Sequence, residues 1–281
     1  MPEVTAPALA CADVAVRFGA GVLVLLPLCA GGLGTITRRE WLQAVGLAFL
    51  AGTGLYLQTL GLAWADASVV GFLTQLYTLI VPLIVALRDR CLPGGRVVIA
   101  CALVLAGAAT LSPDLVHHLR LGPGELVTVA STFFFACQIV WVERPLFAEN
   151  RPTLVTMLMF ALLALMFGTG YAAEGGNAAT LGRLFAPAPV EIMFLVLLFP
   201  CTIFTFLIMN AWQRWLSATE AGLIYCIEPV IAAILAGFLP AWISWYAGVP
   251  YPNEPLTWGL FFGGLMIVSA TVLVATEKRT G

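Results

Sequence analysis

VEIMFLVLLFPCTIFTFLIMNAW, residues 190–212, is a run of twenty-three residues with a single side chain that is charged at neutral pH. A helix needs about 20 predominantly apolar residues to cross the hydrocarbon core of a bilayer, so this run predicts a transmembrane helix. Comparable runs recur along the whole chain and are separated by Pro, Gly and Arg. The predicted transmembrane helices are residues 13–33, 41–63, 67–87, 97–111, 124–143, 153–173, 190–212, 218–239 and 256–275.

The composition favours the same fold class. Hydrophobic residues make up 61% of the chain and charged residues 10%, whereas soluble domains carry about 25% charged residues. A soluble protein with a very large core is the alternative, and it is disfavoured because helix-spanning runs occupy most of the sequence. We therefore predict an all-α fold, a polytopic bundle of nine transmembrane helices in a lipid bilayer.

The composition also argues against several kinds of site and partner. The seven cysteines contain no CxxC pair, and most lie in apolar runs, so we expect neither a disulfide framework nor a metal site. We expect no cofactor. The net charge of −2 gives no sign of a nucleic-acid partner.

Basic residues predict the orientation of the helices. If the connectors alternate between two sides, ten Lys and Arg residues fall on one side and only Arg120 and Arg183 on the other, with Arg17 inside the first helix. Basic connectors stay in the cytoplasm. We therefore expect the N-terminus outside and the C-terminus inside a cell membrane, the inner membrane if the source is bacterial. The basic side holds Arg38, Arg39, Arg88, Arg90, Arg96, Arg144, Arg151, Arg214, Lys278 and Arg279.

An internal repeat relates the two halves of the chain. Residues 64–80 align with residues 215–231 at an offset of 151. The matched pairs are Trp64 with Trp215, Ala67 with Ala218, Ser68 with Thr219, Gly71 with Gly222 and Ile80 with Ile231. The predicted helix 124–143 has no partner in the first half. Repeats of this kind are typical of secondary transporters, whose site lies between the repeats.

Two stretches resemble the EamA-like drug/metabolite transporters. One is GLYLQTLGLA at 54–63, followed by Ala67-Ser68, Phe72-Leu73-Thr74 and Pro82-Leu83, and the other is LSATEAGLIYCIEPV at 216–230. The resemblance implies ten helices in two inverted five-helix repeats with both termini in the cytoplasm. It also implies export of amino acids or other small metabolites, by exchange or by coupling to an ion gradient.

The chain departs from that pattern at its start. Residues 13–33, with Val16-Arg17-Phe18, resemble the second helix of the family. The first repeat would then be residues 13–111 with four helices, and the second residues 124–275 with five. Either the start codon is assigned too far downstream, so that a first helix is missing from this sequence, or the chain is a natural nine-helix variant. A nine-helix chain agrees with an outer N-terminus.

Glu228 is the sharpest candidate for a functional residue. It lies near the middle of the predicted helix 218–239 and is followed by Pro229, which removes a backbone donor and frees a carbonyl near Tyr225. Ionisable groups inside a membrane are costly and mark pathways or sites. Glu228 could therefore bind a substrate amine or carry a coupling proton. The alternative is a protonated or hydrogen-bonded glutamate that stabilises helix packing.

Further polar residues are candidates for the lining of a central substrate cavity. Gln75 and Tyr77 lie at mid-depth in the predicted helix 67–87, and Tyr77 aligns with Glu228 at the repeat offset. Hydrogen bonding between helices is the alternative for this pair. The remaining candidates are Tyr225, Asn210, Tyr56 and Gln58, of which Tyr56 and Gln58 cannot both point inward.

Two features of the helices have more than one explanation. Arg17, near the outer end of the first predicted helix, either extends outward to the interface or acts as a gate for anions or protons. Gly259 and Gly263 form a GxxxG pattern that permits close helix packing, and a homodimer is left open.

These observations predict a secondary-active transporter, an exporter of a small-molecule substrate that works by alternating access. The sequence has no G-x-x-x-x-G-K-[ST] motif for ATP. It is not expected to be an enzyme, because no paired Asp, Ser–His or His cluster falls in the predicted helices. The alternative is a non-transporting or decayed membrane protein of the same fold.

Overall fold

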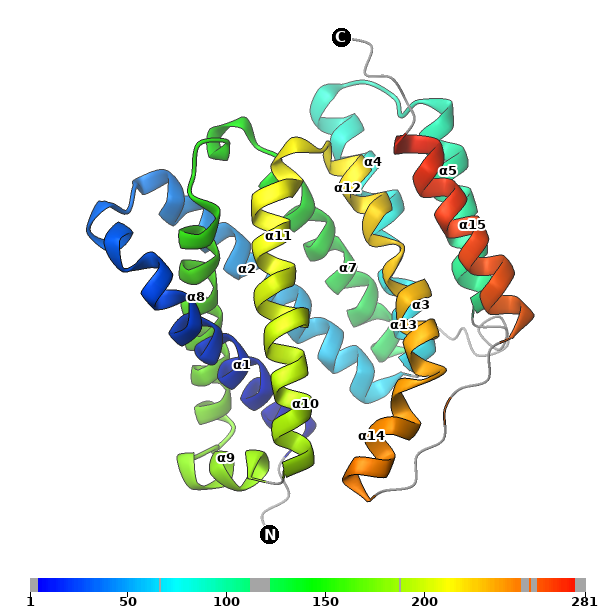
Figure 1. The fold of residues 1–281 in the computed structure, drawn as a ribbon. Coiled ribbons are helices and arrows are strands. Elements are labelled where there is room, and N and C mark those ends of the chain that lie inside the picture. The colour runs from blue at the N-terminus through cyan, green and yellow to red at the C-terminus, as the bar shows by residue number, and fades with distance from the viewer. Residues whose placement is uncertain are drawn as a thin grey trace. The chain divides into compact units, whose positions relative to one another are not determined.

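The computed structural model describes residues 5–65, 67–111, 122–186, 188–248, 253 and 257–275, and every regular element within these ranges is a helix (Figure 1). Seven helical segments in this part of the chain are long and apolar enough to cross a membrane. They are Pro7–Thr35, Arg38–Trp64, Val69–Asp89, Pro123–Val142, Pro152–Ala173, Val190–Trp215 and Ala218–Ala236. Two shorter apolar helices cover Gly95–Thr110 and Trp258–Val274. Each of the nine predicted stretches therefore overlaps an apolar helix, and the chain is an integral membrane protein.

The chain forms two compact units, and each takes residues from both halves of the sequence. Unit 1 comprises Met1–Thr59 and Trp141–Leu216, and unit 2 comprises Leu60–Val140 and Ser217–Gly281. The units therefore differ from the repeats predicted at 13–111 and 124–275, and the division into repeats stays a prediction.

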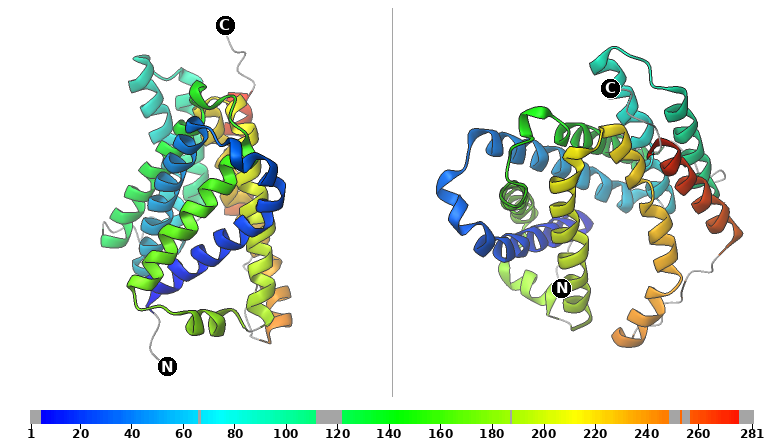
Figure 2. Two further views of the ribbon diagram at one scale, coloured as in Figure 1. Left: turned by 90° about the vertical axis from the view of Figure 1, so that its left-hand side faces the viewer. Right: turned by 45° about the horizontal axis from the view of Figure 1, so that its top comes forward.

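Unit 1 is built around the packing of its first helix on a helix from the second half of the chain. Its elements are α1 (Ala6–Cys29), η1 (Ala30–Thr35), most of α2 (Arg38–Trp64), η2 (Pro145–Phe147), α8 (Pro152–Ala173), α9 (Ala178–Phe185), α10 (Ala188–Leu198), η3 (Phe199–Phe204), α11 (Thr205–Trp212) and η4 (Gln213–Trp215). Helix α1 packs along α8 (Figure 2). Phe18, Phe160 and Phe206, from α1, α8 and α11, meet edge to face with ring centroids 5.0 to 5.7 Å apart. Aromatic pairs in this geometry add to the stability given by their buried area.

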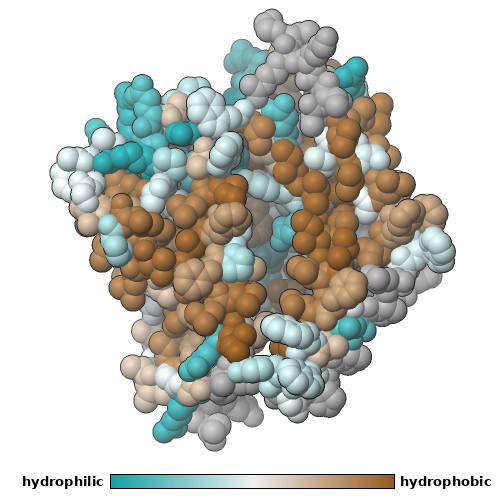
Figure 3. Space-filling view, viewed as in Figure 1, coloured by the Kyte–Doolittle hydropathy of each residue, from teal (hydrophilic) through white to brown (hydrophobic). Residues whose placement is uncertain are grey.

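A polar network ties the connectors together at one end of unit 1. Glu40, 2% exposed, closes a capping box with Thr37 at the start of α2 and accepts a 2.7 Å hydrogen bond from Arg151 Nε. The carboxylate of Glu40 also raises the pKa of Arg151. Arg151 Nη2 donates to the Thr35 carbonyl at 2.8 Å. Hydrophilic side chains gather over this end of the unit at the upper left of Figure 3.

Further hydrogen bonds join the same connectors. Asn150 Nδ2 donates to Gln43 Oε1 at 2.7 Å, and Arg214 Nη1 donates to the Ala148 carbonyl at 3.0 Å. The start of α2, the segment around η2 and the end of α11 therefore meet at one end of the unit. Five of the basic residues predicted to share the cytoplasmic side lie in these segments: Arg38, Arg39, Arg144, Arg151 and Arg214.

We expect Glu40→Ala to lower the melting temperature of the protein in detergent by about 5 °C or more. The change removes a helix cap and leaves Arg151 without the carboxylate that it contacts through both Nε and Nη2. Arg39→Ala is the control, because Arg39 and Glu149 are 4.0 Å apart and both largely exposed, a type of pair that contributes little. Equal melting temperatures for Glu40→Ala and Arg39→Ala would contradict a stabilising role for the network.

Unit 2 contains the close pairing of α5 with α15, which run side by side in Figures 1 and 2. Its elements are the end of α2, then α3 (Ala67–Thr74), α4 (Tyr77–Asp89), α5 (Gly95–Leu111), α7 (Pro123–Val142), α12 (Ala218–Tyr225), α13 (Glu228–Ala236), α14 (Leu239–Ala247) and α15 (Trp258–Ala275). A Cβ placed on Gly107 would lie 2.7 Å from the Gly263 carbonyl oxygen, and one on Gly259 would lie 2.5 Å from the Thr110 carbonyl oxygen. The GxxxG glycines therefore pack against α5 of the same chain.

Some predicted boundaries were wrong. The first helix begins at Ala6 rather than at residue 13, because Thr5 caps it: the Thr5 hydroxyl accepts a hydrogen bond from the Ala8 amide at 3.2 Å. The predicted helices 67–87 and 218–239 are each broken into two segments. Helices α9 and α14 were not predicted. The basic residues Arg120, Lys278 and Arg279 lie outside the described residues.

Candidate functional site

Two predicted membrane helices of unit 2 are broken at matching positions. Helix α3 ends at Thr74 and α4 begins at Tyr77, while α12 ends at Tyr225 and α13 begins at Glu228. Both the ends and the starts differ by 151 residues, which is the offset of the sequence repeat. Tyr77 and Glu228, paired in the sequence, are therefore the first residues of the two second segments.

The backbone hydrogen bonds at the two breaks follow one pattern. Gln75 N–H donates to Phe72 O at 2.9 Å, and Cys226 N–H donates to Leu223 O at 3.2 Å. Three further hydrogen bonds match at the same offset: Leu76 to Leu73 with Ile227 to Ile224, Leu79 to Leu76 with Val230 to Ile227, and Ile80 to Leu76 with Ile231 to Ile227. Most of these bonds span three residues rather than four, so the helix tightens at each break before it resumes.

Different side chains accompany the two breaks. Pro229 is the second residue of α13 and supplies no backbone donor. The position 151 residues earlier is Thr78, whose hydroxyl donates to the Gln75 carbonyl at 2.7 Å. Pro82 lies inside α4, five residues after its start. The same interruption therefore occurs with different local chemistry.

Tyr77 and Cys226 bring two buried polar groups together where α4 packs against α12, and Gln75 lies two residues before Tyr77. Tyr77 is 4% exposed, and its hydroxyl oxygen lies 3.8 Å from the sulfur of Cys226, which is fully buried. Gln75 is also 4% exposed, and its Oε1 finds no hydrogen-bond partner among the described residues. An unpaired buried carbonyl oxygen is costly, and it is available to a donor that enters from outside the chain.

Glu228 differs from these neighbours because it is exposed. Within the described part of the chain it makes no hydrogen bond or ion pair. It occupies the first turn of α13, where the positive end of the helix favours a carboxylate. Tyr225, three residues earlier, is partly buried. The break of α12 and α13 thus presents a free carboxylate that can accept hydrogen bonds or bind a cation.

The structure divides the eight candidate residues between the two units. Gln75, Tyr77, Tyr225 and Glu228 lie in unit 2, at or beside the breaks. The other four lie in unit 1, and they are Arg17, Tyr56, Gln58 and Asn210.

The four candidates in unit 1 have varied surroundings. Asn210 in α11 is 3% exposed, donates to Thr156 Oγ1 at 2.9 Å and keeps an Oδ1 without a partner among the described residues. Tyr56 is 38% exposed, whereas Gln58 is partly buried.

Arg17 lies deeper in its helix than predicted. Because α1 begins at Ala6, Arg17 is about three turns from the helix start rather than one. Its Nη2 is 3.5 Å from Asp13 Oδ2, and its guanidinium lies 5.6 Å from the ring centroid of Phe18. The role of Arg17 as a gate stays a prediction.

Three residues with a polar or charged side chain in or beside the apolar helices were not among the predicted candidates: Cys226, Asp13 and Glu191. Cys226 was treated as an ordinary small hydrophobe, although the repeat pairs it with Gln75. Asp13 is spaced four residues before Arg17, which is the spacing of a helical ion pair. Glu191 follows a proline-rich connector at the start of an apolar run, with a phenylalanine three residues after it.

Comparison with known proteins gives a likeness of fold. No family model matches the chain, and no curated protein matches its sequence. A crystal structure described only as that of a protein superposes with a TM-score of 0.63 over 97% of this chain and 88% of the other, at 18% identity. At that identity the likeness concerns the fold alone.

Proposed function

We propose that this chain is a secondary-active transporter that moves a small organic solute across a membrane by alternating access. The observation that carries the proposal is the pair of matched breaks at Gln75–Leu76 and Cys226–Ile227. Broken helices at mid-depth are how transporters place backbone dipoles and polar side chains around a substrate or ion. Two such interruptions at matching positions favour this use over a purely structural role.

The make-up of the two units supports the same proposal. Unit 1 takes the first part of each half of the chain and unit 2 the second part of each half. The elements that pack most closely are α1 with α8 in unit 1 and α5 with α15 in unit 2, and each pair has one member from each half. This is the arrangement that an inverted repeat produces, and one bundle moving against another is a usual basis of alternating access.

The resemblance to the EamA-like drug/metabolite transporters makes the proposal more specific. It favours export of amino acids or other metabolites from the cell across its inner membrane. Glu228, Tyr77 and Gln75 are the residues that we expect to touch the solute in unit 2, and Asn210 is the corresponding candidate in unit 1. Any coupling proton would be carried by Glu228.

Counterflow in liposomes tests the proposal. The purified full chain is reconstituted with an excess of unlabelled solute inside, and entry of the radiolabelled solute is followed for a panel of amino acids, amines and organic acids. We expect transient accumulation of at least one solute above that in protein-free liposomes. Folded, reconstituted protein that accumulates no member of the panel would favour the non-transporting alternative.

The proposed topology has a direct test in cysteine labelling. Cys91 is exposed in the connector that follows α4, so it reports the side of the Arg88–Arg96 segment once the other cysteines are replaced. We expect an impermeant maleimide to reach Cys91 and Glu149→Cys from the cytoplasmic side only. Ala179→Cys in α9 should react only from the opposite side. Labelling of Cys91 and Glu149→Cys from opposite sides would overturn the topology.

A further inference from the structure

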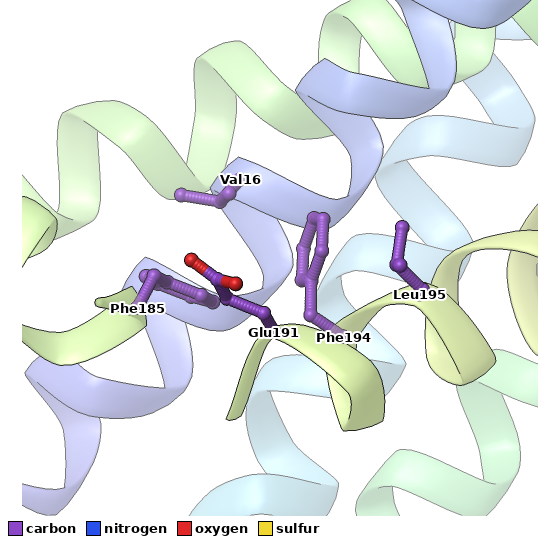
Figure 4. Close-up of a pocket in the computed structure, with 5 residues that line it drawn as sticks. All are labelled: Val16, Phe185, Glu191, Phe194 and Leu195. Atoms are coloured by element: carbon purple, nitrogen blue, oxygen red, sulfur yellow. The ribbon is translucent and has the colours of Figure 1, made fainter. Parts of the chain in front are cut away.

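A cavity of about 370 Å³ lies within unit 1. It is lined by Val16 of α1, Phe185 of α9, and Glu191, Phe194 and Leu195 of α10. Its size falls within the range of small-molecule sites. Figure 4 shows that the Glu191 side chain extends from α10 on the side of the cavity that faces Val16, and that Phe185 and Phe194 also line the cavity.

The cavity combines one carboxylate with two aromatic rings. The rings of Phe185 and Phe194 meet edge to face, with centroids 5.5 Å apart and an interplanar angle of 80°. An aromatic ring attracts a cation over its face, and the attraction grows when the cation loses water. The other lining residues in the described part of the chain, Val16 and Leu195, are aliphatic. Such a lining suits a ligand with a positive head and a small apolar body.

The carboxylate of Glu191 is available to such a ligand. Among the described residues Glu191 makes no hydrogen bond and no ion pair, and its side chain is exposed. The two other helices that line the cavity each carry one basic residue. Arg17 of α1 contacts Asp13, and Arg183 of α9 makes no ion pair in the described part of the chain. Glu191 lies in the first turn of α10, where the helix dipole favours a negative charge.

We infer that this cavity is a binding site for an organic monocation, a primary ammonium group attached to a small apolar or aromatic body. The ammonium group contacts the Glu191 carboxylate and the ring faces, and the apolar body fills the space beside Val16 and Leu195. The ammonium can belong to a free amine or to the headgroup of phosphatidylethanolamine. The inference does not depend on transport, because it concerns binding to unit 1 alone.

The test is calorimetric titration of phenethylammonium into the full chain in dodecyl maltoside, a detergent without charge. We expect saturable binding to the wild-type protein and binding at least about tenfold weaker to Glu191→Gln, since a charge-assisted contact is lost. Phe194→Leu keeps an apolar wall but removes a ring, and it should weaken binding by about three- to fivefold. Glu174→Gln, at an exposed carboxylate outside the cavity, should bind like the wild type.

A neutral probe and a lipid competitor complete the design. 2-Phenylethanol has the shape of the probe without its charge and should bind at least about tenfold more weakly. Competition by dihexanoyl phosphatidylethanolamine, but not by dihexanoyl phosphatidylglycerol, would identify the lipid as a source of the ammonium. Absence of competition would identify free amines. The inference is overturned if the wild type does not bind phenethylammonium, if Glu191→Gln binds within twofold of wild type, or if 2-phenylethanol binds as tightly.

Discussion

Glu228→Gln is expected to reduce the rate of solute counterflow at least tenfold. The substitution keeps the size of the side chain and removes the negative charge at the start of α13. A hydrogen bond to a charged group is worth about 1.5–3 kcal/mol, and 1.4 kcal/mol corresponds to a factor of ten in affinity. Glu228 is exposed and makes no hydrogen bond or ion pair with the described residues, so its removal should cost the fold little.

The pH dependence of transport separates two roles of Glu228. If Glu228 carries the coupling proton, the wild-type rate varies with pH and the residual rate of Glu228→Gln does not. If Glu228 only binds the solute, the variant retains the pH profile at a lower rate. Counterflow measured at a series of pH values distinguishes the two results.

The control for Glu228→Gln is Glu149→Gln, which removes an exposed carboxylate between η2 and α8. We expect Glu149→Gln to transport at the wild-type rate. A Glu228→Gln protein with the rate and pH profile of the wild type would remove Glu228 from the site. Such a result would leave Tyr77 and Gln75 as the candidates in unit 2.

The helices could be predicted from sequence because a transmembrane helix needs an apolar run of a known minimum length, and such runs are visible in the sequence. Each of the nine predicted stretches overlaps an apolar helix, and errors concentrate at the ends. The predicted first helix began at residue 13 and left out residues 6–12, which include Pro7. That proline lies in the first helical turn, where it is tolerated.

The breaks could be only partly predicted. Pro229 indicated a disturbed backbone near Tyr225, and the repeat offset paired Tyr77 with Glu228. The break at Gln75 had no comparable signal, because its proline, Pro82, lies five residues into α4. At that interruption the Thr78 hydroxyl donates a hydrogen bond to the Gln75 carbonyl, a contact that hydropathy does not describe.

The pattern of apolar residues could not predict the short helices or the hydrogen-bond partners of buried side chains. Helix α9 has eight residues, too few for a reliable pattern, and α14 follows α13 across a two-residue interruption. The hydrogen bond from Asn210 to Thr156 joins residues 54 positions apart. Sequence reasoning selected Asn210 as a polar residue in an apolar helix but had no means to find its partner.

Gly107→Val is expected to lower the melting temperature of the protein by about 5 °C or more, an effect that corresponds to the cost of about 1–3 kcal/mol for overpacking a close contact. The added Cβ would lie 2.7 Å from the Gly263 carbonyl oxygen and 2.8 Å from a side-chain carbon of Ile267. A backbone carbonyl cannot rotate away as a side chain can, so α5 and α15 must separate. Gly168→Val is the matched control, because nothing lies within 4 Å of the Cβ that it would add in α8.

Gly259→Val tests the α5–α15 contact from the side of α15. Its Cβ would lie 2.5 Å from the Thr110 carbonyl oxygen. If both glycines serve one α5–α15 interface, the double variant should lose less stability than the sum of the single variants, because one separation relieves both collisions. The molar mass of the protein–detergent complex should not change in either variant. If the GxxxG pattern instead held a homodimer together, the variants would lower the molar mass and change the melting temperature little. That outcome would contradict the packing described for unit 2.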